Sequence, residues 1–154
     1  MTAQRALSVA HWLAFGIPVA LLGGAFIGEY GFDLYPCDMC WWQRYPHFAA
    51  IGLSMTGFFA KPRALFVLLA GLAILSSGLI GAFHAGVEYG WWEGLTSCSA
   101  AVGGGIDAIY SNFTLVRCDE VQWELFGISL AGYNFLISTA GALAIFLLLR
   151  KHRT

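Results

Sequence analysis

The chain has 154 residues, of which 58% are hydrophobic, 16% are aromatic and only 11% are charged, with a mean hydropathy of +0.69. A soluble domain of this length carries about a quarter charged residues and buries about two thirds of its surface, so it could not hide this many apolar side chains. The composition therefore predicts a membrane protein. It also excludes a disordered chain, and the net charge of −1 gives no sign of nucleic-acid binding.

Three uncharged stretches, 6–28, 64–87 and 125–149, are long enough to cross a bilayer, because a spanning helix needs about 20 apolar residues. A fourth, 45–60, is shorter, but neighbouring aromatic residues extend it and Arg44 can snorkel to the membrane surface. We therefore expect an all-α membrane protein with a four-helix transmembrane bundle as its single domain. The predicted spans are about 9–28, 42–60, 64–85 and 129–149, with outer loops at about 29–41 and 86–128.

The basic residues set the predicted orientation. Lys61-Pro62-Arg63 should interrupt the helix, and its two basic residues predict a tight turn at the cytoplasmic surface. Because the number of spans is even, both termini are then expected in the cytoplasm. Six basic residues fall on this inner side: Arg5, Lys61, Arg63, Arg150, Lys151 and Arg153. All nine acidic residues fall on the outer side, together with Arg44 and Arg117. A cleaved signal peptide is a poor alternative to the first span, because the apolar stretch is too long.

The outer loop at about 86–128 is long for a protein whose other loops are short, and such loops are usually functional. It contains a Gly-rich stretch at 100–105. Residues 106–116 then place apolar side chains at roughly helical spacing, with Asp107, Ser111 and Asn112 between them. One interpretation is a short amphipathic helix lying on the outer leaflet.

The four cysteines all lie in the two outer loops, and none lies in a span or on the inner side: Cys37, Cys40, Cys98 and Cys118. The outer side of a bacterial inner membrane is oxidising. We therefore interpret the cysteines first as disulfides or redox couples, located in the periplasm.

Cys37 and Cys40 form a Cys-x-x-Cys motif directly before the second predicted span. If Cys40 begins that helix, backbone N–H groups and the positive end of the helix dipole lower the pKa of its thiol. Arg44 lies one helical turn further on the same face, where a fixed cation stabilises a thiolate and a negatively charged acceptor beside it. Asp38 opposes this effect. Arg44 is otherwise explained as a snorkelling interfacial arginine, but its spacing from Cys40 favours the functional interpretation.

Two other interpretations of the cysteines are weaker. A zinc site would need a second close pair or histidines at ligand spacing, whereas Cys98 and Cys118 are far apart and His47 lies deeper in its helix, so no metal is expected. Purely structural disulfides are a further alternative, but a Cys-x-x-Cys ring closes too short a loop to stabilise much.

Cys98 and Cys118 bracket the central part of the long loop, where a disulfide is accessible to an incoming thiolate. One redox pair thus faces soluble partners and the other lies against the membrane. This arrangement predicts an electron relay from protein thiols in water to a lipid-soluble acceptor.

These features resemble the DsbB family of disulfide bond formation proteins from bacterial inner membranes. The resemblance covers nearly the whole chain: four spans, Cys37-x-x-Cys40 with Arg44 four residues later, and a second cysteine pair in the long loop. It is most specific at 118–127, which is similar to the family's Cys-x-x-x-Gln-Trp-x-hydrophobic-x-Gly stretch.

The resemblance implies a role for each residue. Cys98 would be attacked by a reduced DsbA-like thioredoxin-fold oxidase in the periplasm, and Cys118 would exchange with Cys37. Cys40 would interact as a thiolate with a bound quinone, either ubiquinone or menaquinone, and Arg44 would hold that quinone. The implied activity is a quinone-dependent thiol:disulfide oxidoreductase that reoxidises its partner.

His84 and Glu88, one helical turn apart at the outer end of the third span, are further candidates for the quinone pocket. The plainer interpretation, which the sequence alone favours, places both residues at the lipid headgroup boundary. Two rival functions stay open. A reductase of the vitamin K epoxide reductase type also has four helices, but its similar Cys-x-x-Cys lies near the last helix. A membrane scaffold with inert disulfides, or a transporter, is the other rival, although no span carries a carboxylate at mid-depth.

Overall fold

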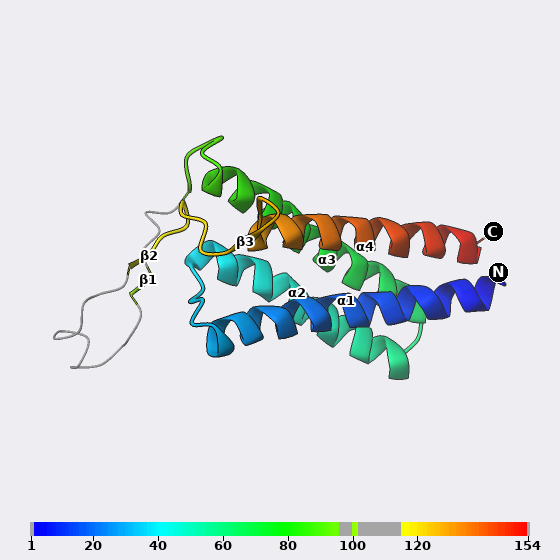
Figure 1. Cartoon of the computed structure of the whole chain (residues 1–154). Helices are drawn as coiled ribbons and strands as arrows, with labels where there is room; N and C mark the ends of the chain where they lie inside the picture. The colour runs from blue at the N-terminus through cyan, green and yellow to red at the C-terminus, as the bar shows by residue number, and fades with distance from the viewer. Residues whose placement is uncertain (1, 96–99, 102–114, 154) are drawn as a thin grey trace.

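The structure is a computed structural model that describes residues 2–95, 100, 101 and 115–153. Four helices run side by side along its length, as Figure 1 shows. They are α1 (Ala3–Gly31), α2 (Asp38–Phe59), α3 (Arg63–Glu88) and α4 (Leu130–Arg153). Two short antiparallel strand pairs lie in the loop before α4: β1 (Ala100–Ala101) with β2 (Leu115–Val116), and β3 (Glu124–Leu125) with β4 (Ile128–Ser129). The predicted set of four helices is confirmed.

Three of these helices are long and apolar enough to cross a membrane: α1, α3 and α4. Helix α1 has 29 residues, which corresponds to about 43 Å of helix. Helix α2 has 22 residues, which is long enough, but it is not apolar enough to be counted with them; its N-terminal half carries Gln43, Arg44 and His47. Its crossing of the membrane therefore stays a prediction.

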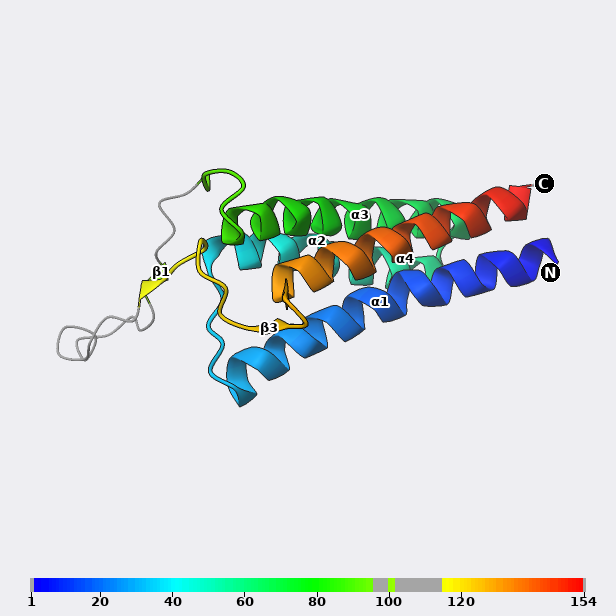
Figure 2. The ribbon, with the colours of Figure 1, turned by 45° about the horizontal axis from the view of Figure 1, so that its top comes forward.

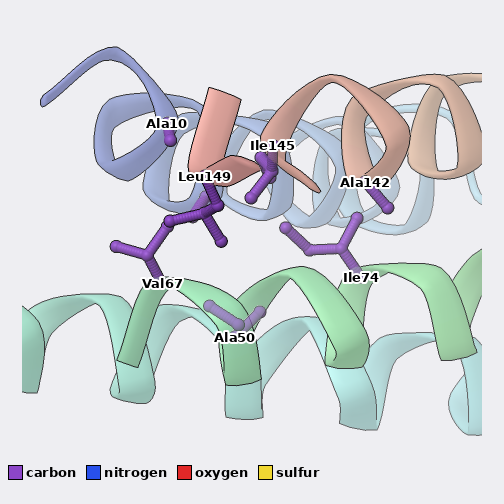
Figure 3. Packing of buried hydrophobic residues seen from close by; sticks show 9 residues of the cluster. Ala10, Ala50, Val67, Ile74, Ala142, Ile145 and Leu149 are labelled. Carbon is purple, nitrogen blue, oxygen red and sulfur yellow. The ribbon is translucent and has the colours of Figure 1, made fainter. Parts of the chain in front are cut away.

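The helices pack around a hydrophobic cluster in the half of the bundle away from the long loop. Figure 3 shows side chains from all four helices meeting there. Small residues let the backbones approach, and larger aliphatic residues fill the remaining space. The buried members are Ala10, Ala14, Ala50, Val67, Ala70, Ile74, Ala142, Ile145 and Leu149.

Glycines bring α3 and α4 into close contact towards the other half of the bundle. A Cβ atom on Gly81 would lie 2.9 Å from the carbonyl oxygen of Ala131 and 3.0 Å from the amide of Asn134. A Cβ atom on Gly78 would lie 2.9 Å from the hydroxyl of Thr139. These positions leave no room for a side chain, so glycine here sets how closely polar groups of the two helices can meet.

The segment that leads into α4 is a tight hairpin. Phe126 and Gly127 join β3 to β4, and both have positive φ values, 52° and 73°, as the turn of a two-residue hairpin requires. Tyr89, at the end of α3, holds this hairpin: its hydroxyl donates to the Gly127 carbonyl at 3.2 Å and accepts from the Ser129 N–H at 2.9 Å.

Both termini lie at one end of the bundle and the long loop lies at the other (Figure 1). His152 contacts the carbonyl of Ala3 at 3.1 Å and so joins the two chain ends. The amphipathic helix predicted at 106–116 lies mostly outside the described residues. Its last two residues, Leu115–Val116, form strand β2, so the prediction of a helix is wrong at that end.

Candidate redox centre

Cys37 caps the N-terminus of α2. Its backbone is extended, and its Sγ accepts a hydrogen bond from the Cys40 N–H at 3.3 Å. The helix therefore begins at Asp38, and Cys40 lies in the first turn. The helix starts two residues before Cys40, because the Cys37 sulfur occupies the capping position that serine or aspartate usually fills.

No disulfide bond joins Cys37 to Cys40 in the structure, and their sulfur atoms are 3.0 Å apart with the Cys37 thiol donating to Cys40. This hydrogen bond, together with burial, raises the pKa of the Cys37 thiol. The same hydrogen bond lowers the pKa of Cys40, which precedes the predicted span at 42–60, although burial acts in the opposite direction. The pair thus consists of a protonated Cys37 and a Cys40 that ionises more readily, as its predicted role requires.

Cys118 lies beside Cys37, although the two are far apart in sequence. The sulfur atoms of Cys37 and Cys118 and one ring nitrogen of His84 lie within 4.8 Å of one another. All three residues are almost fully buried, packed with Met39, Val87 and Phe83. We call Cys37, Cys118 and His84 the sulfur cluster. Cys98, the fourth predicted cysteine, lies outside the described residues.

His84 connects the sulfur cluster to amides inside the bundle. Its Nε2 is 3.6 Å from Cys37 Sγ, and its Nδ1 accepts a hydrogen bond from the Gln43 side-chain amide at 2.8 Å. The ring proton therefore sits on Nε2, facing the sulfur. Asn134 donates in turn to Gln43 Oε1 at 2.8 Å, so α2, α3 and α4 share one buried chain of hydrogen bonds.

His47 continues this chain towards the middle of the bundle. Its Nε2 donates to Asn134 Oδ1 at 3.0 Å and lies 2.9 Å from the Ser77 hydroxyl. The opposite nitrogen, Nδ1, is buried and has no hydrogen-bond partner within the described part of the chain. A buried acceptor in this state favours a ligand that brings a donor.

Arg44 is paired with a residue of α1. Its guanidinium donates to Glu29 Oε2 at 2.5 Å, and it lies over the rings of Phe26 and Trp41 at 5.0 and 4.9 Å from their centroids. Both side chains of the ion pair are largely buried. Arg44 is close enough to Cys40 to stabilise negative charge there, and Glu29, Phe26 and Trp41 hold its guanidinium in place.

Glu88, the remaining candidate, has a largely buried side chain at the C-terminal end of α3. One carboxylate oxygen accepts a hydrogen bond from the hydroxyl of Ser129, and the other lies 3.8 Å from His84 Nε2. The structure therefore brings the side chains of His84 and Glu88 together with Cys37.

A pocket of about 600 Å³ lies next to the sulfur cluster. Its wall is mostly apolar and includes the C-terminal half of α1, which diverges from α4 towards the end of the bundle that carries β3 (Figure 2). Its polar lining includes residues already described: Cys37, Cys40, Gln43, Arg44, His47, His84, Glu88 and Asn134. Arg117, Glu120 and Gln122, from the segment before α4, also line it. The pocket has the size and composition of a small-molecule site.

Several of these residues were not identified from the sequence. Glu29 was assigned only to the acidic outer side, and Gln43 and Asn134 were not singled out at all. Their partners lie on other helices, 15, 41 and 91 positions away in the chain, so no local spacing signals them. Uncharged amides inside a helix predicted to cross a membrane were the available signal.

Comparison with known proteins assigns the family. A family model described as disulfide bond formation protein DsbB matches residues 7–148. A disulfide bond formation protein B of Marinobacter nauticus is 28% identical over 153 residues, covering 91% of this chain and 90% of its own. A protein of the same name from Verminephrobacter eiseniae is 31% identical over 150 residues, covering 88% and 82%.

An uncharacterized protein of Rickettsia prowazekii is 30% identical over 138 residues, covering 84% of this chain and 80% of its own. No solved structure matches. Because the family model extends over the Cys-x-x-Cys motif, the sulfur cluster and all four helices, the chain belongs to the DsbB family of membrane-embedded disulfide bond formation proteins.

Proposed function

We propose that this protein is a quinone-linked oxidase that reoxidises a periplasmic DsbA-like thioredoxin-fold protein. The observation that carries the proposal is the position of Cys118 beside Cys37, with Cys40 and Arg44 lining the adjacent pocket. A cysteine of the long loop is thus within reach of the Cys-x-x-Cys pair, and that pair is next to a space for an acceptor. The DsbA–DsbB–quinone system is the standard example of this chemistry in the periplasm.

The pocket suits a quinone. It is mostly apolar and has about the right volume for a substituted ring, and Cys40, Arg44 and the His84 chain are among its polar groups. Within the described part of the chain, Nδ1 of His47 has no hydrogen-bond partner, and it would accept a hydrogen bond from the hydroxyl of a reduced quinone. A bound quinone would supply the oxidising power that thiol–disulfide exchange cannot generate, by taking up two electrons and two protons.

The cysteines act in sequence in this proposal. A partner thiolate attacks Cys98 of a Cys98–Cys118 disulfide, forms a mixed disulfide and releases Cys118 as a thiolate. Cys118 then attacks Cys37 Sγ, which breaks the Cys37–Cys40 bond and releases Cys40 as a thiolate. Arg44 and the lowered pKa of Cys40 favour this leaving group. In the net reaction a partner dithiol becomes a disulfide and a quinone becomes a hydroquinone.

His84 assists at Cys37. Its Nε2–H faces the sulfur at 3.6 Å, so it can donate a hydrogen bond to Cys37 Sγ and stabilise negative charge there as the Cys37–Cys40 bond opens and closes. Gln43 holds the ring in this tautomer through Nδ1. The histidine thereby places a hydrogen-bond donor next to the exchanging sulfur.

We also propose that α2 crosses the inner membrane together with the other three helices and that both termini are cytoplasmic. The termini and the Lys61–Arg63 turn share one end of the bundle, while the sulfur cluster lies at the other (Figure 1). Positively charged residues collect on the cytoplasmic side of membrane proteins, so the cysteines face the periplasm.

Quinone reduction by the purified protein tests the proposal. Reduction of added ubiquinone or menaquinone should occur when a reduced thioredoxin-fold oxidase is supplied and should stop in Cys37→Ser and Cys40→Ser. Ser76→Ala, an exposed hydroxyl on α3 bonded to its own helix, is the matched control and should behave as the parent protein. Continued quinone reduction in Cys40→Ser would contradict the relay and would leave structural disulfides as the explanation of the cysteines.

A further inference from the structure

The sulfur cluster also brings together the donor atoms of a metal site, which disulfide exchange does not require. Cys37, Cys118 and His84 come from the cap of α2, the segment after β2 and helix α3, and they offer two sulfurs and one ring nitrogen within 4.8 Å. Cys40 Sγ adds a third sulfur, 3.0 Å from that of Cys37. Three cysteines and one histidine form a frequent ligand set of structural zinc sites.

The separation of Cys37 Sγ and His84 Nε2 agrees with tetrahedral zinc coordination, and the Cys118 sulfur lies within 4.8 Å of Cys37 Sγ and of one ring nitrogen of His84. Zn–S and Zn–N bonds of about 2.3 and 2.0–2.1 Å in a tetrahedron place a sulfur and a nitrogen ligand about 3.6 Å apart. Cys37 Sγ and His84 Nε2 are 3.6 Å apart. Two sulfur ligands would be about 3.8 Å apart in the same geometry, so Cys40 would have to move away from Cys37 by less than about 1 Å.

We propose that the fully reduced centre binds one Zn²⁺ through Cys37, Cys118 and His84, with Cys40 as the fourth ligand. Sequence spacing gave no such site, because His84 is 47 positions from Cys37. Thiols lose their protons on binding zinc, and a sulfur held in a disulfide offers no thiolate. Zinc is therefore bound by the reduced state alone, and it occupies the sulfurs that must exchange. Zn²⁺ would therefore inhibit the enzyme by holding its cysteines in the reduced state when no quinone is available to oxidise them.

The residues around the cluster support a metal-bound histidine. With zinc on Nε2, the neutral ring of His84 carries its proton on Nδ1 and needs an acceptor there. Gln43 is already 2.8 Å from Nδ1 and can turn its amide oxygen towards the ring. Glu88, near the same ring, adds negative charge beside the cation.

Metal titration of the purified full chain in detergent tests this inference, without quinone or partner protein. The protein is reduced under anaerobic conditions and titrated with Co²⁺, whose thiolate charge-transfer and visible bands report a tetrahedral site, and then with Zn²⁺ in competition. We expect one Zn²⁺ per reduced chain and none in the oxidised chain. Cys118→Ser and His84→Gln should each weaken binding by at least about tenfold.

Two controls separate ligand loss from general damage. His11→Gln removes a buried histidine that bonds to the carbonyl of Ser54 at 2.8 Å, outside the sulfur cluster, and should leave zinc affinity unchanged. If a ligand variant fails to fold, zinc protection of wild-type Cys37 and Cys118 from alkylation, read by mass spectrometry, provides the same information.

The outcomes are decisive in both directions. Absence of binding to the reduced chain, equal binding to the oxidised chain, or full binding in both Cys118→Ser and His84→Gln would overturn the zinc site. None of these results bears on quinone reduction, which is measured with the metal removed by a chelator. Failure of the proposed function and failure of the zinc site are therefore distinguishable.

Discussion

Arg44 of α2 and Glu29 of α1 form a largely buried ion pair, with 2.5 Å between Nη1 and Oε2. Removing one member leaves the other as an uncompensated charge, which is costly in a poorly solvated site. We predict that Glu29→Gln and Arg44→Met are each destabilising, and that the double variant is more stable than the sum of the two losses. A double-mutant cycle of unfolding in mixed micelles should give a coupling free energy of about 1–3 kcal/mol. A coupling near zero would mean that the pair does not fix Arg44.

Arg44 should also matter for the acceptor more than for the partner protein. Its guanidinium lines the pocket, whereas the thiol that the partner is proposed to attack belongs to the long loop. Arg44→Met should therefore raise the apparent KM for quinone more than that for the reduced partner. Steady-state kinetics with each substrate varied in turn measures both values. Equal effects on the two constants would support a purely interfacial arginine.

The two cysteines of the Cys-x-x-Cys motif should differ in reactivity. The Cys37 thiol donates a hydrogen bond to Cys40, which raises the pKa of Cys37 and lowers that of Cys40. Since the thiolate is the nucleophile, iodoacetamide at neutral pH should modify Cys40 at least about tenfold faster than Cys37. Peptide mass spectrometry of the reduced protein over time gives both rates. Faster labelling of Cys37 would reverse the assignment of the leaving thiolate.

The loop cysteines should have opposite effects on the complex with the partner. Cys98→Ala removes the sulfur that the partner is proposed to attack and should prevent a mixed disulfide. Cys118→Ala leaves that attack possible but removes the sulfur that exchanges with Cys37, so the complex should persist. Non-reducing electrophoresis after acid quenching detects it. The opposite pattern would exchange the two roles.

Gly81 should be needed for the contact between α3 and α4. A methyl group there would meet the backbone carbonyl of Ala131 at 2.9 Å and the amides of Asn134 and Gln43 at 3.0 Å. Gly81→Ala should lower the free energy of unfolding by about 1–3 kcal/mol and disturb the hydrogen bonds that hold His84. Gly52→Ala, where a methyl group would meet nothing within 4 Å, is the matched control and should be neutral or slightly stabilising.

The sequence was sufficient to predict the helices, because missing charges mark apolar helices directly. Their observed bounds extend beyond the predicted ones where capping continues the helix into polar residues: α1 begins at Ala3 because the Thr2 hydroxyl caps it. The β3–β4 hairpin was not predicted, because Phe126 is a bulky residue at a positive φ, a conformation that its side chain does not favour.

From the residues alone, the candidate site was predictable only where its members lie close together in sequence; the exchange between Cys118 and Cys37 came from the resemblance to the family. Cys37, Cys40 and Arg44 share one helix start, and His84 and Glu88 share one helix turn. The pairing of Arg44 with Glu29 and the meeting of Cys118 with Cys37 depend on how helices and loops pack, which periodicity does not encode. Gln43 and Asn134 were missed for the same reason, although they fix the ring next to the sulfur.

The capping role of Cys37 has a practical consequence for experiments that remove thiols. Serine and alanine are commonly used as equivalent replacements for cysteine, but only serine can accept the Cys40 N–H that the Cys37 sulfur accepts here. Loss of an N-cap acceptor costs about 1 kcal/mol. Cys37→Ala would therefore loosen the start of α2 as well as remove the redox group, whereas Cys37→Ser removes the redox group and keeps the helix start in place.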